Sequence, residues 1–333
     1  MNAPRAMFAL QDADLVGELF DAADLTRLRD LVRVDPHVLT PPDYRAPETA
    51  AGPEILITGW GAPRLDVRAL ERMPDLRAVF HAAGSVKRVV SPALWERGIR
   101  VSSSAAANAV PVAEYTLSMV LLSAKRAWDA AEVFQRTHDM TAARPRGRVG
   151  AYGITVGIVG ASRIGRRVLD LLRPFDITPV VYDPSLSTTA AADLGATLVP
   201  LDGLLRASDV VSLHAPSLPE TRHMIGAPEL AAMRDGATLI NTARGDLVDT
   251  DALLAELTAG RLSAVLDVTE PEPLPPGHPL FSAPGVTLTP HIAGSLGNEL
   301  RRMGHQTVDE VERFVTRGSL EFEVQRRDLA TIA

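Results

Sequence analysis

Short apolar runs alternate with amphipathic stretches of helix length along almost the whole chain. In the first hundred residues the helical pattern covers residues 24–34 and 66–72. The apolar runs around these stretches predict strands near Met7–Leu10, Ile55–Thr58, Ala78–His81 and Arg100–Ser102. Strands that alternate with helices in this way are typical of a parallel sheet covered by helices.

A second series of the same kind begins at residue 154. Turn residues or a helical stretch follow each apolar run, as in a doubly wound parallel sheet. The sequence therefore predicts an α/β protein with two such domains. The predicted strands of this second series are Ile154–Val159, Pro179–Tyr182, Thr197–Val199, Asp209–Leu213, Thr238–Asn241, Ser263–Leu266 and Val286–Thr289.

Two longer helices frame the second series. Residues 111–126 (PVAEYTLSMVLLSAKR) predict one long helix that has Pro111 in its first turn and apolar side chains on most sides. A helix of this composition is expected to be buried. A last amphipathic helix is predicted over residues 298–316.

Length and composition narrow the classes of protein. The chain has 333 residues, which corresponds to about two domains, and its 46% apolar and 23% charged residues are typical of a soluble globular protein. The formal net charge of −7 argues against binding to nucleic acid or to an acidic membrane. The absence of cysteine excludes disulfides, thiolate metal sites and a cysteine nucleophile, and it fits a reducing cytoplasm.

Two further kinds of site are not expected. The chain has no uninterrupted apolar stretch of about 18 residues, so we expect no membrane span. It also has no HExxH motif and no clustered carboxylate pattern, so we expect no metal site.

A glycine-rich turn stands where a dinucleotide site requires one. The predicted strand ITVGIV runs into GASRIG and then into a helical stretch, which is the strand–turn–helix order of a dinucleotide-binding fingerprint. The helix N-terminus would offer free N–H groups and its positive dipole end to a pyrophosphate. Ser162 replaces the middle glycine, and its hydroxyl can donate to a phosphate or its bulk can weaken binding. The candidate residues of this turn are Gly160, Ser162, Arg163, Ile164 and Gly165.

Asp183 ends the next predicted strand, eighteen residues after Gly165. A carboxylate at this place binds the ribose hydroxyls of NAD and repels the extra phosphate of NADP. We therefore expect NAD as the cofactor, with NADP disfavoured by Asp183. The alternative is a tight strand–helix turn followed by an exposed aspartate.

Three further segments carry reactive side chains just past predicted strands: NTARG (241–245), DVTEPEP (267–273) and TPH (289–291). The carboxyl ends of parallel strands meet at one edge of a sheet, where open α/β folds bind ligands. An arginine, a glutamate and a histidine gathered there would form an acid–base site with an anion anchor. Taken singly, Arg244 can cap a turn, Glu272 can be a solvated loop residue and His291 can be an ordinary surface histidine.

In their order along the chain, five segments resemble the D-isomer-specific 2-hydroxyacid dehydrogenases, a family that includes glyoxylate/hydroxypyruvate reductases and phosphoglycerate dehydrogenases. The segments are VGIVGASRIGRRV, LHAPSLPETRHMI, LINTARGDLVDTDAL, LDVTEPEPLPPGHPL and TPHIAGS. The resemblance implies a Rossmann NAD-binding domain over residues 108–293, inserted into a flavodoxin-like substrate domain of residues 1–107 and 294–333. It also implies a homodimer that uses NAD to interconvert a small 2-oxo acid and its D-2-hydroxy acid. From the absence of cysteine we expect the protein to be cytoplasmic.

The resemblance implies roles for individual residues. His291 matches the acid–base residue, Glu272 matches the carboxylate that favours its imidazolium form, and Arg244 matches the arginine that binds the substrate carboxylate and polarises the oxo group. Glu272 fits the family better than Glu270 because it lies five residues after Asp267. Positions that line the cofactor in the family are His214, Ala215, Pro216, Thr221, Thr242, Ala243 and, beside the nicotinamide carboxamide, Asp267.

The substrate loop departs from the family pattern. Residues 81–88 read HAAGSVKR, and Lys87 stands about where the family has an aspartate. Backbone N–H groups around Ala83 and Gly84 can still hold a substrate carboxylate. Lys87 either binds a second anionic group of the substrate or is a surface lysine.

Two other functions stay open at this stage. Corepressor-like relatives of this fold bind NAD(H) as a redox signal with little or no turnover, although they do not need Arg244, Glu272 and His291 together. Relatives that oxidise phosphite keep the same three residue types. Formate dehydrogenase, which uses a glutamine where this chain has Glu272, fits less well.

Overall fold

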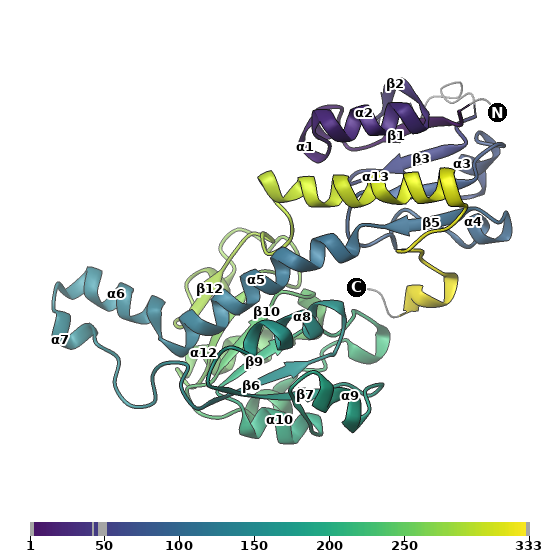
Figure 1. Cartoon of the computed structure of the whole chain (residues 1–333). Coiled ribbons are helices and arrows are strands. Elements are labelled where there is room, and N and C mark those ends of the chain that lie inside the picture. Colours follow the sequence, from purple (N-terminus) through teal and green to yellow (C-terminus); the bar gives the residue numbers. More distant parts are fainter. Residues whose placement is uncertain (1–2, 42, 46–51, 331–333) are drawn as a thin grey trace. The chain divides into compact units, whose positions relative to one another are not determined.

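The computed structural model describes residues 3–41, 43–45 and 52–330 (Figure 1). The described chain forms two compact units. Unit 1 holds the residues up to Ala109 and those from Ser295 onward, and unit 2 holds Val110–Gly294. The boundaries expected from the sequence lay at residues 107/108 and 293/294.

Unit 1 contains a five-stranded sheet in which all neighbouring strands are parallel. Its strand order, β2-β1-β3-β4-β5, is that of flavodoxin-like folds. The strands are β1 (Arg5–Ala9), β2 (Arg33–Leu39), β3 (Ile55–Thr58), β4 (Ala78–His81) and β5 (Arg100–Ser103). The helices are α1 (Asp14–Leu19), α2 (Ala22–Leu31), α3 (Val67–Glu71), α4 (Pro92–Glu96) and α13 (Leu300–Arg317).

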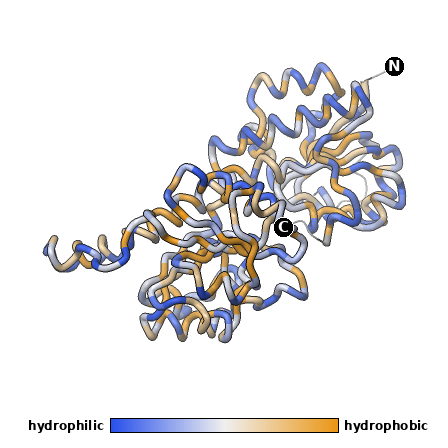
Figure 2. The backbone as a smooth tube through the Cα atoms, turned by 60° about the horizontal axis from the view of Figure 1, so that its bottom comes forward, coloured by the Kyte–Doolittle hydropathy of each residue, from blue (hydrophilic) through white to orange (hydrophobic). Residues whose placement is uncertain are grey.

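Alternate side chains of the unit 1 sheet enter two separate cores. On β1, Phe8 packs in one core with Leu28 of α2 and Met303 of α13. Its neighbour Met7 packs in the other core, together with Leu70 of α3. This period of two covers both faces of the sheet, as a parallel sheet requires. In Figure 2 the hydrophobic positions lie mainly in the interior of each unit.

The edge strand β2 was missed by the sequence prediction, which placed a helix over residues 24–34 and no strand between residues 10 and 55. The structure ends α2 at Leu31 and forms β2 directly afterwards. Most side chains of β2 are exposed, so the strand has no apolar run that could reveal it. Pro36 is tolerated because β2 is an edge strand whose register with β1 shifts between Ala6 and Phe8.

Unit 2 contains a seven-stranded parallel sheet of order β12-β11-β10-β9-β6-β7-β8. The order reverses between β6 and β9, which is the point where open α/β sheets bind ligands. The prediction of two doubly wound parallel sheets is confirmed. The strands are β6 (Ile154–Val159), β7 (Ile177–Tyr182), β8 (Thr197–Leu198), β9 (Val210–Leu213), β10 (Thr238–Asn241), β11 (Ser263–Leu266) and β12 (Val286–Leu288). The helices are α6 (Ala127–Thr137), α7 (Met140–Ala143), α8 (Arg163–Leu172), α9 (Thr188–Asp193), α10 (Leu201–Ala207), α11 (Ala227–Ala232) and α12 (Thr250–Thr258).

The long helix α5 (Ala105–Ala124) starts earlier than the sequence predicted. The prediction placed Pro111 in the first turn, but the structure places it inside the helix. Residues 105–107 are alanines, which favour the helix, and Ser103 Oγ accepts the Ala105 N–H at 3.1 Å. The helix can therefore begin before the proline.

The helix α5 is also less buried than expected. In its most apolar window 39% of the residues are buried, among them Ala113 and Val120 in a core of unit 2. By length and hydropathy alone α5 could cross a membrane, a test that core helices of soluble proteins also pass.

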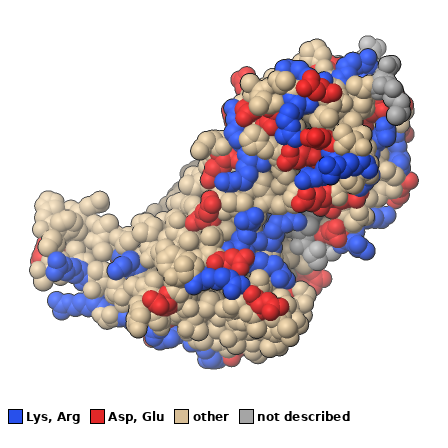
Figure 3. Space-filling view, in the orientation of Figure 1, with Lys and Arg blue, Asp and Glu red and all other residues tan. Residues whose placement is uncertain are grey.

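The segment of residues 122–152 in unit 2 leaves several large apolar side chains exposed. It contains α6 and α7, which lie apart from the sheet of unit 2 (Figure 1). No described residue of α6 is buried. The exposed apolar side chains are Leu122, Phe134, Met140 and Tyr152. Elsewhere, on the face seen in Figure 3, basic side chains lie beside acidic ones.

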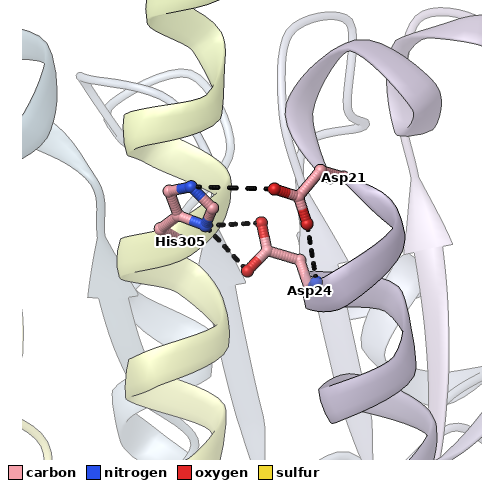
Figure 4. A group of neighbouring side chains, drawn as sticks. All are labelled: Asp21, Asp24 and His305. Atoms are coloured by element: carbon pink, nitrogen blue, oxygen red, sulfur yellow. Dashed lines mark hydrogen bonds and ion pairs between the residues drawn. The ribbon is translucent and has the colours of Figure 1, made fainter.

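In unit 1, α2 and α13 are joined by a polar contact (Figure 4). His305 Nδ1 lies 2.7 Å from Oδ2 of Asp24, which is 2% exposed, and His305 Nε2 lies 4.0 Å from Asp21 Oδ2. Asp21 caps α2 by accepting the Asp24 N–H. The sequence predicted no metal site, yet within the described residues these three side chains have a spacing that a metal ion could use.

Candidate active site

The turn between β6 and α8 is packed so closely that two of its positions require glycine. Gly160 has a φ of +98°, and a Cβ there would lie 2.7 Å from the Ala215 nitrogen. A Cβ at Gly165 would collide with the carbonyl oxygen of Gly160. These glycines allow the backbone to turn sharply at the end of β6 and let α8 begin beside it.

Ser162, which replaces the middle glycine, is the N-cap of α8. Its Oγ accepts the Gly165 N–H at 3.3 Å. In the part of the chain that the structure describes, the N–H groups of Arg163 and Ile164 meet no protein acceptor. The helix terminus therefore keeps two donors and its dipole for an anion, which fits a pyrophosphate.

Asp183 follows β7 and contacts this turn. Its Oδ2 accepts the Ala161 N–H at 2.8 Å, and its Oδ1 accepts the N–H and the hydroxyl of Ser185 at 2.8 and 2.6 Å. Burial raises the pKa of Asp183, but these hydrogen bonds outweigh burial and hold the pKa below its ordinary value. The carboxylate is thus ionised and fixed beside the turn, and its oxygens can accept further donors such as ribose hydroxyls.

The segment after β9 is shaped by its own side chains. His214 is buried, its Nε2 lies 2.9 Å from Ser212 Oγ, and burial lowers its pKa to about 3. Thr221 Oγ1 donates to the Pro216 carbonyl at 2.6 Å and accepts the Leu218 N–H at 2.9 Å. The segment therefore holds a neutral histidine at the switch point and a loop that Thr221 keeps folded.

The turn after β10 presents Arg244. Asn241 Nδ2 donates to the Arg244 carbonyl at 2.8 Å, and Asn241 Oδ1 accepts the Ala243 N–H at 3.1 Å. Thr242 is buried, with its Oγ1 3.0 Å from Thr116 Oγ1 of α5. Arg244 itself is half-buried and its Nη1 donates to the Ala243 carbonyl at 2.6 Å. The guanidinium is therefore held at the carboxyl edge of the sheet.

Asp267, directly after β11, is buried and holds the turn that follows β12. Its Oδ1 accepts the Thr289 hydroxyl at 2.6 Å and the Ile292 N–H at 2.8 Å, and its Oδ2 accepts the Ala293 N–H at 2.9 Å. Its backbone carbonyl accepts the His291 N–H at 3.0 Å. The resemblance implied a role beside the nicotinamide, and the contacts within the chain give Asp267 a role in positioning His291.

His291 lies in this turn with a φ of +55° and an exposed side chain, and its Nδ1 is 2.5 Å from Glu272 Oε1. Glu270 pairs instead with Arg222 at 2.6 Å and with His223 Nε2 at 2.8 Å. Burial raises the pKa of Glu270, but the contacts with His223 and Arg222 outweigh burial and hold the pKa below its ordinary value. Of the two glutamates in this loop, Glu272 is the one that contacts His291, which leaves His291 Nε2 as the nitrogen that can face a ligand.

In unit 1, the residues of the predicted substrate loop follow β4. Ala83 is buried there, and Gly84 and Lys87 are half-buried. Arg244, Glu272 and His291 all belong to unit 2, where they follow the neighbouring strands β10, β11 and β12.

Several residues that shape the site were not identified from the sequence. Tyr115 Oη lies 2.8 Å from Thr289 Oγ1, which extends the Asp267 network to α5. The sequence predicts Asn241 only as the start of its segment, and it predicts no role for His223. None of these residues has a local sequence signal, because each acts through a partner that is distant in the sequence or through backbone atoms.

Three kinds of comparison relate the chain to known proteins. Residues 118–293 match the family model described as "D-isomer specific 2-hydroxyacid dehydrogenase, NAD binding domain". The chain is 34% identical over 258 residues to a glyoxylate reductase of Aeropyrum pernix, an alignment that covers 75% of this chain and 77% of the relative. It is 36% identical over 251 residues to a D-3-phosphoglycerate dehydrogenase of Mycobacterium tuberculosis, of which it spans 47%. The crystal structure of D-mandelate dehydrogenase from Rhodotorula graminis superposes with a TM-score of 0.81 at 25% identity, covering 97% of this chain and 98% of that one.

Proposed function

Because the chain belongs to the D-isomer-specific 2-hydroxyacid dehydrogenases, a family of oxidoreductases with an NAD-binding domain, we propose that it reduces a small 2-oxo acid to the D-2-hydroxy acid with NADH. The observation that carries this proposal is the pair of His291 Nδ1 and Glu272 Oε1, 2.5 Å apart. Bound NADH supplies the hydride, while the chain supplies the proton, the anion anchor and the orientation of the substrate.

His291 gives the proton that accompanies reduction. With Nδ1 held by Glu272, the proton leaves from Nε2 to the alkoxide oxygen that develops as the carbonyl carbon is reduced. The Glu272 carboxylate stabilises the imidazolium and fixes the orientation of the ring. In the oxidation direction the same nitrogen takes the hydroxyl proton.

Arg244 binds the substrate carboxylate. A guanidinium forms two parallel hydrogen bonds with a carboxylate and can also polarise the neighbouring oxo group. In unit 1, the backbone N–H groups of Ala83 and Gly84 are the further donors proposed for a carboxylate. These groups recognise the 2-oxo acid portion that all substrates of this class share.

The cofactor site is proposed to prefer NADH to NADPH. The N-terminus of α8 holds the pyrophosphate, and Asp183 accepts hydrogen bonds from the adenosine ribose hydroxyls. The ionised Asp183 carboxylate, fixed by Ala161 and Ser185, repels a 2′-phosphate at the same place.

We further propose that the enzyme is a cytoplasmic homodimer joined through residues 122–152. The exposed Phe134 and Met140 of this segment, and the absence of any buried residue in α6, support an apolar contact with a second copy. Sedimentation of the wild type and of a Phe134→Ser, Met140→Ser variant tests this, with a dimer expected for the first and a monomer for the second. A wild-type monomer at all concentrations would overturn the assembly but not the activity.

The first test is NADH oxidation against a panel of 2-oxo acids at near-neutral pH. The panel contains glyoxylate, hydroxypyruvate, pyruvate, a branched 2-oxo acid, 2-oxoglutarate and a phosphorylated 2-oxo acid, each repeated with NADPH. Turnover of one class with NADH supports the proposal. Tight NADH binding with no turnover of any member would contradict it and favour a redox-sensing protein.

A matched pair of variants tests the assignment of the acid. Glu272→Gln and Glu270→Gln make the same change two residues apart in one loop, but only Glu272 contacts His291. We expect Glu272→Gln to lower kcat/KM by about 10- to 100-fold and Glu270→Gln to change it little. Equal losses in the two variants would show that the loop acts through its fold and would remove Glu272 from the acid–base pair.

A further inference from the structure

His81 ends β4 and is buried in unit 1, with 4% of its surface exposed. Its Nδ1 lies 3.0 Å from Oγ1 of Thr58, which ends β3 and is itself fully buried. The backbone of Ser85 is the second polar group that meets the ring. The ring therefore connects the carboxyl ends of two neighbouring strands to the loop of residues 82–88.

The ring of His81 is neutral at physiological pH. Burial lowers its pKa to about 4, and the Ser85 backbone offsets only part of that effect. A neutral imidazole offers one donor and one acceptor nitrogen, and its Nδ1 meets Thr58 Oγ1 at 3.0 Å. His81 thus has no proton to give in an acid–base reaction near neutral pH.

Ser103 and Asn108 also contact the loop of residues 82–88, at Gly84. Ser103 Oγ donates to the Gly84 carbonyl at 2.8 Å and accepts the Ala105 N–H at 3.1 Å. Asn108 packs against Gly84, since a Cβ at that position would lie 3.3 Å from Asn108 Nδ2. The backbone of residues 84 and 85 is therefore anchored by contacts within unit 1.

The N–H groups of the same loop have no corresponding partners. Among the described residues, those of Ala83, Gly84 and Ser85 donate to no protein acceptor, whereas the Ala82 N–H donates to the Thr58 carbonyl at 2.7 Å. Buried backbone N–H groups are nearly always paired, and Ala83 is 1% exposed. Three consecutive unpaired N–H groups in such a segment are suited to an anion.

We infer that His81 is a positioning residue for the substrate carboxylate, which holds the 82–88 loop so that the N–H groups of Ala83, Gly84 and Ser85 stay aligned on the anion. The inference rests on the proposed function, because it takes a 2-oxo acid as the ligand of this loop. His81 acts through the loop backbone and does not contact the substrate. Thr58 assists by fixing the ring.

The test uses the full-length protein saturated with NADH, with glyoxylate as substrate and oxalate as a non-reacting probe. We expect His81→Leu to raise the KM for glyoxylate and the Kd for oxalate about tenfold, while kcat and the Kd for NADH stay near the wild-type values. His81→Asn and His81→Gln, which each keep a polar group near one ring nitrogen, should restore part of the affinity. Thr58→Val should give a smaller effect in the same direction.

Three controls separate the outcomes. His37→Leu removes an exposed histidine of the same unit and should change none of these values. Ser103→Ala removes the hydrogen bond to the Gly84 carbonyl and should also weaken the binding of oxalate. This variant keeps the test valid if His81→Leu does not fold. The inference is overturned if His81→Leu leaves oxalate binding intact. It is also overturned if His81→Leu lowers kcat and NADH affinity by the same factor as it lowers oxalate affinity.

The same measurements distinguish this inference from the proposed function. A wild type that binds oxalate but turns over no 2-oxo acid would contradict the reaction, and weaker oxalate binding by His81→Leu would still support the role of His81. A wild type that binds no oxalate in the presence of NADH would overturn the loop as an anion site.

Discussion

The two units each place a neutral, buried histidine at the carboxyl edge of a parallel sheet, but they surround it differently. His81 ends β4 of unit 1, and His214 follows β9 of unit 2. Burial lowers their pKa values to about 4 and about 3. His81 meets both Thr58 and Ser85, whereas His214 meets Ser212 and its Nδ1 has no partner among the described residues.

This difference fits the two anion sites proposed above, one in each unit. In unit 2 the donors stand at the N-terminus of α8, where helix geometry itself leaves N–H groups free and aligns their dipoles. In unit 1 the donors stand in an irregular loop, which no repeating backbone pattern holds in place. A helix terminus therefore needs glycines that let the ligand and the strand come close, while the loop needs side chains such as His81 and Ser103 that hold it.

The largest effects are expected at the side chains of unit 2 that are proposed to act on the substrate. Arg244→Ala and His291→Ala should each lower kcat/KM by about a hundredfold or more, because one removes the anion anchor and the other the proton donor. Steady-state kinetics on the best substrate of the panel measures the loss. NADH titration by fluorescence is the control, since neither change alters the turn between β6 and α8. Near-normal turnover in either variant would withdraw the role assigned to that residue.

The second prediction concerns how His81 and His214 make the stability of the fold depend on pH. The folded protein keeps His81 and His214 neutral, while the unfolded chain protonates each with a pKa near 6.5. The unfolded state therefore binds more protons below pH 6.5, so stability falls as pH falls from there toward the folded pKa values of about 4 and 3. We expect the free energy of unfolding to be about 2 kcal/mol lower at pH 5 than at pH 7 for each of the two histidines.

Urea unfolding of the wild type and of His81→Gln at pH 7 and pH 5 measures this loss. The variant should be less stable than the wild type at pH 7 and should lose less stability between the two pH values. An identical pH dependence in the two proteins would mean that His81 is not held neutral in the folded state.

The fold could be predicted from the sequence wherever a strand is buried on both faces. The runs at 55–58, 78–81, 154–159, 238–241 and 263–266 match observed strands to the residue, because such strands read as continuous apolar segments. The edge strand β2 could not be found in this way, because its exposed side chains and Pro36 hide it. The start of α5 was misplaced because proline was given more weight than the alanines before it.

The candidate site was predicted where a residue's role follows from its own chemistry. The glycines of the turn, Asp183 and the three polar segments at strand ends were found because their residue types and spacing are distinctive. The sequence predicts no role for His81, because its main contact, Thr58, lies 23 residues away and its proposed effect acts through backbone atoms. The choice between Glu270 and Glu272 likewise depended on a family spacing, since both glutamates have the same local chemistry.

A smaller effect is expected at Asp183, and it tests whether the turn between β6 and α8 selects its cofactor. Asp183→Ser removes the carboxylate but leaves a short polar side chain. The Kd for NADH should rise about tenfold and the Kd for NADPH should fall, because the hydrogen bonds to ribose and the repulsion of its phosphate are both lost. Fluorescence titration with both cofactors measures the change, and Asp193→Ser, an exposed aspartate of α9 in the same unit, is the control. An unchanged ratio of the two Kd values would show that selectivity lies elsewhere.

The smallest effect concerns the contact between α2 and α13, a tie in unit 1 that is remote from the 82–88 loop in sequence. His305→Gln should lower the free energy of unfolding by about 1 kcal/mol, because it weakens the partner of Asp24 while half of the histidine side chain is already in water. Asp21→Asn should cost less, since asparagine caps a helix as well as aspartate does. Glyoxylate KM should stay at the wild-type value in both, which separates a stabilising histidine from the positioning role of His81. If added zinc raises the melting temperature of the wild type but not of His305→Gln, the three side chains are metal ligands and the ion-pair account is wrong.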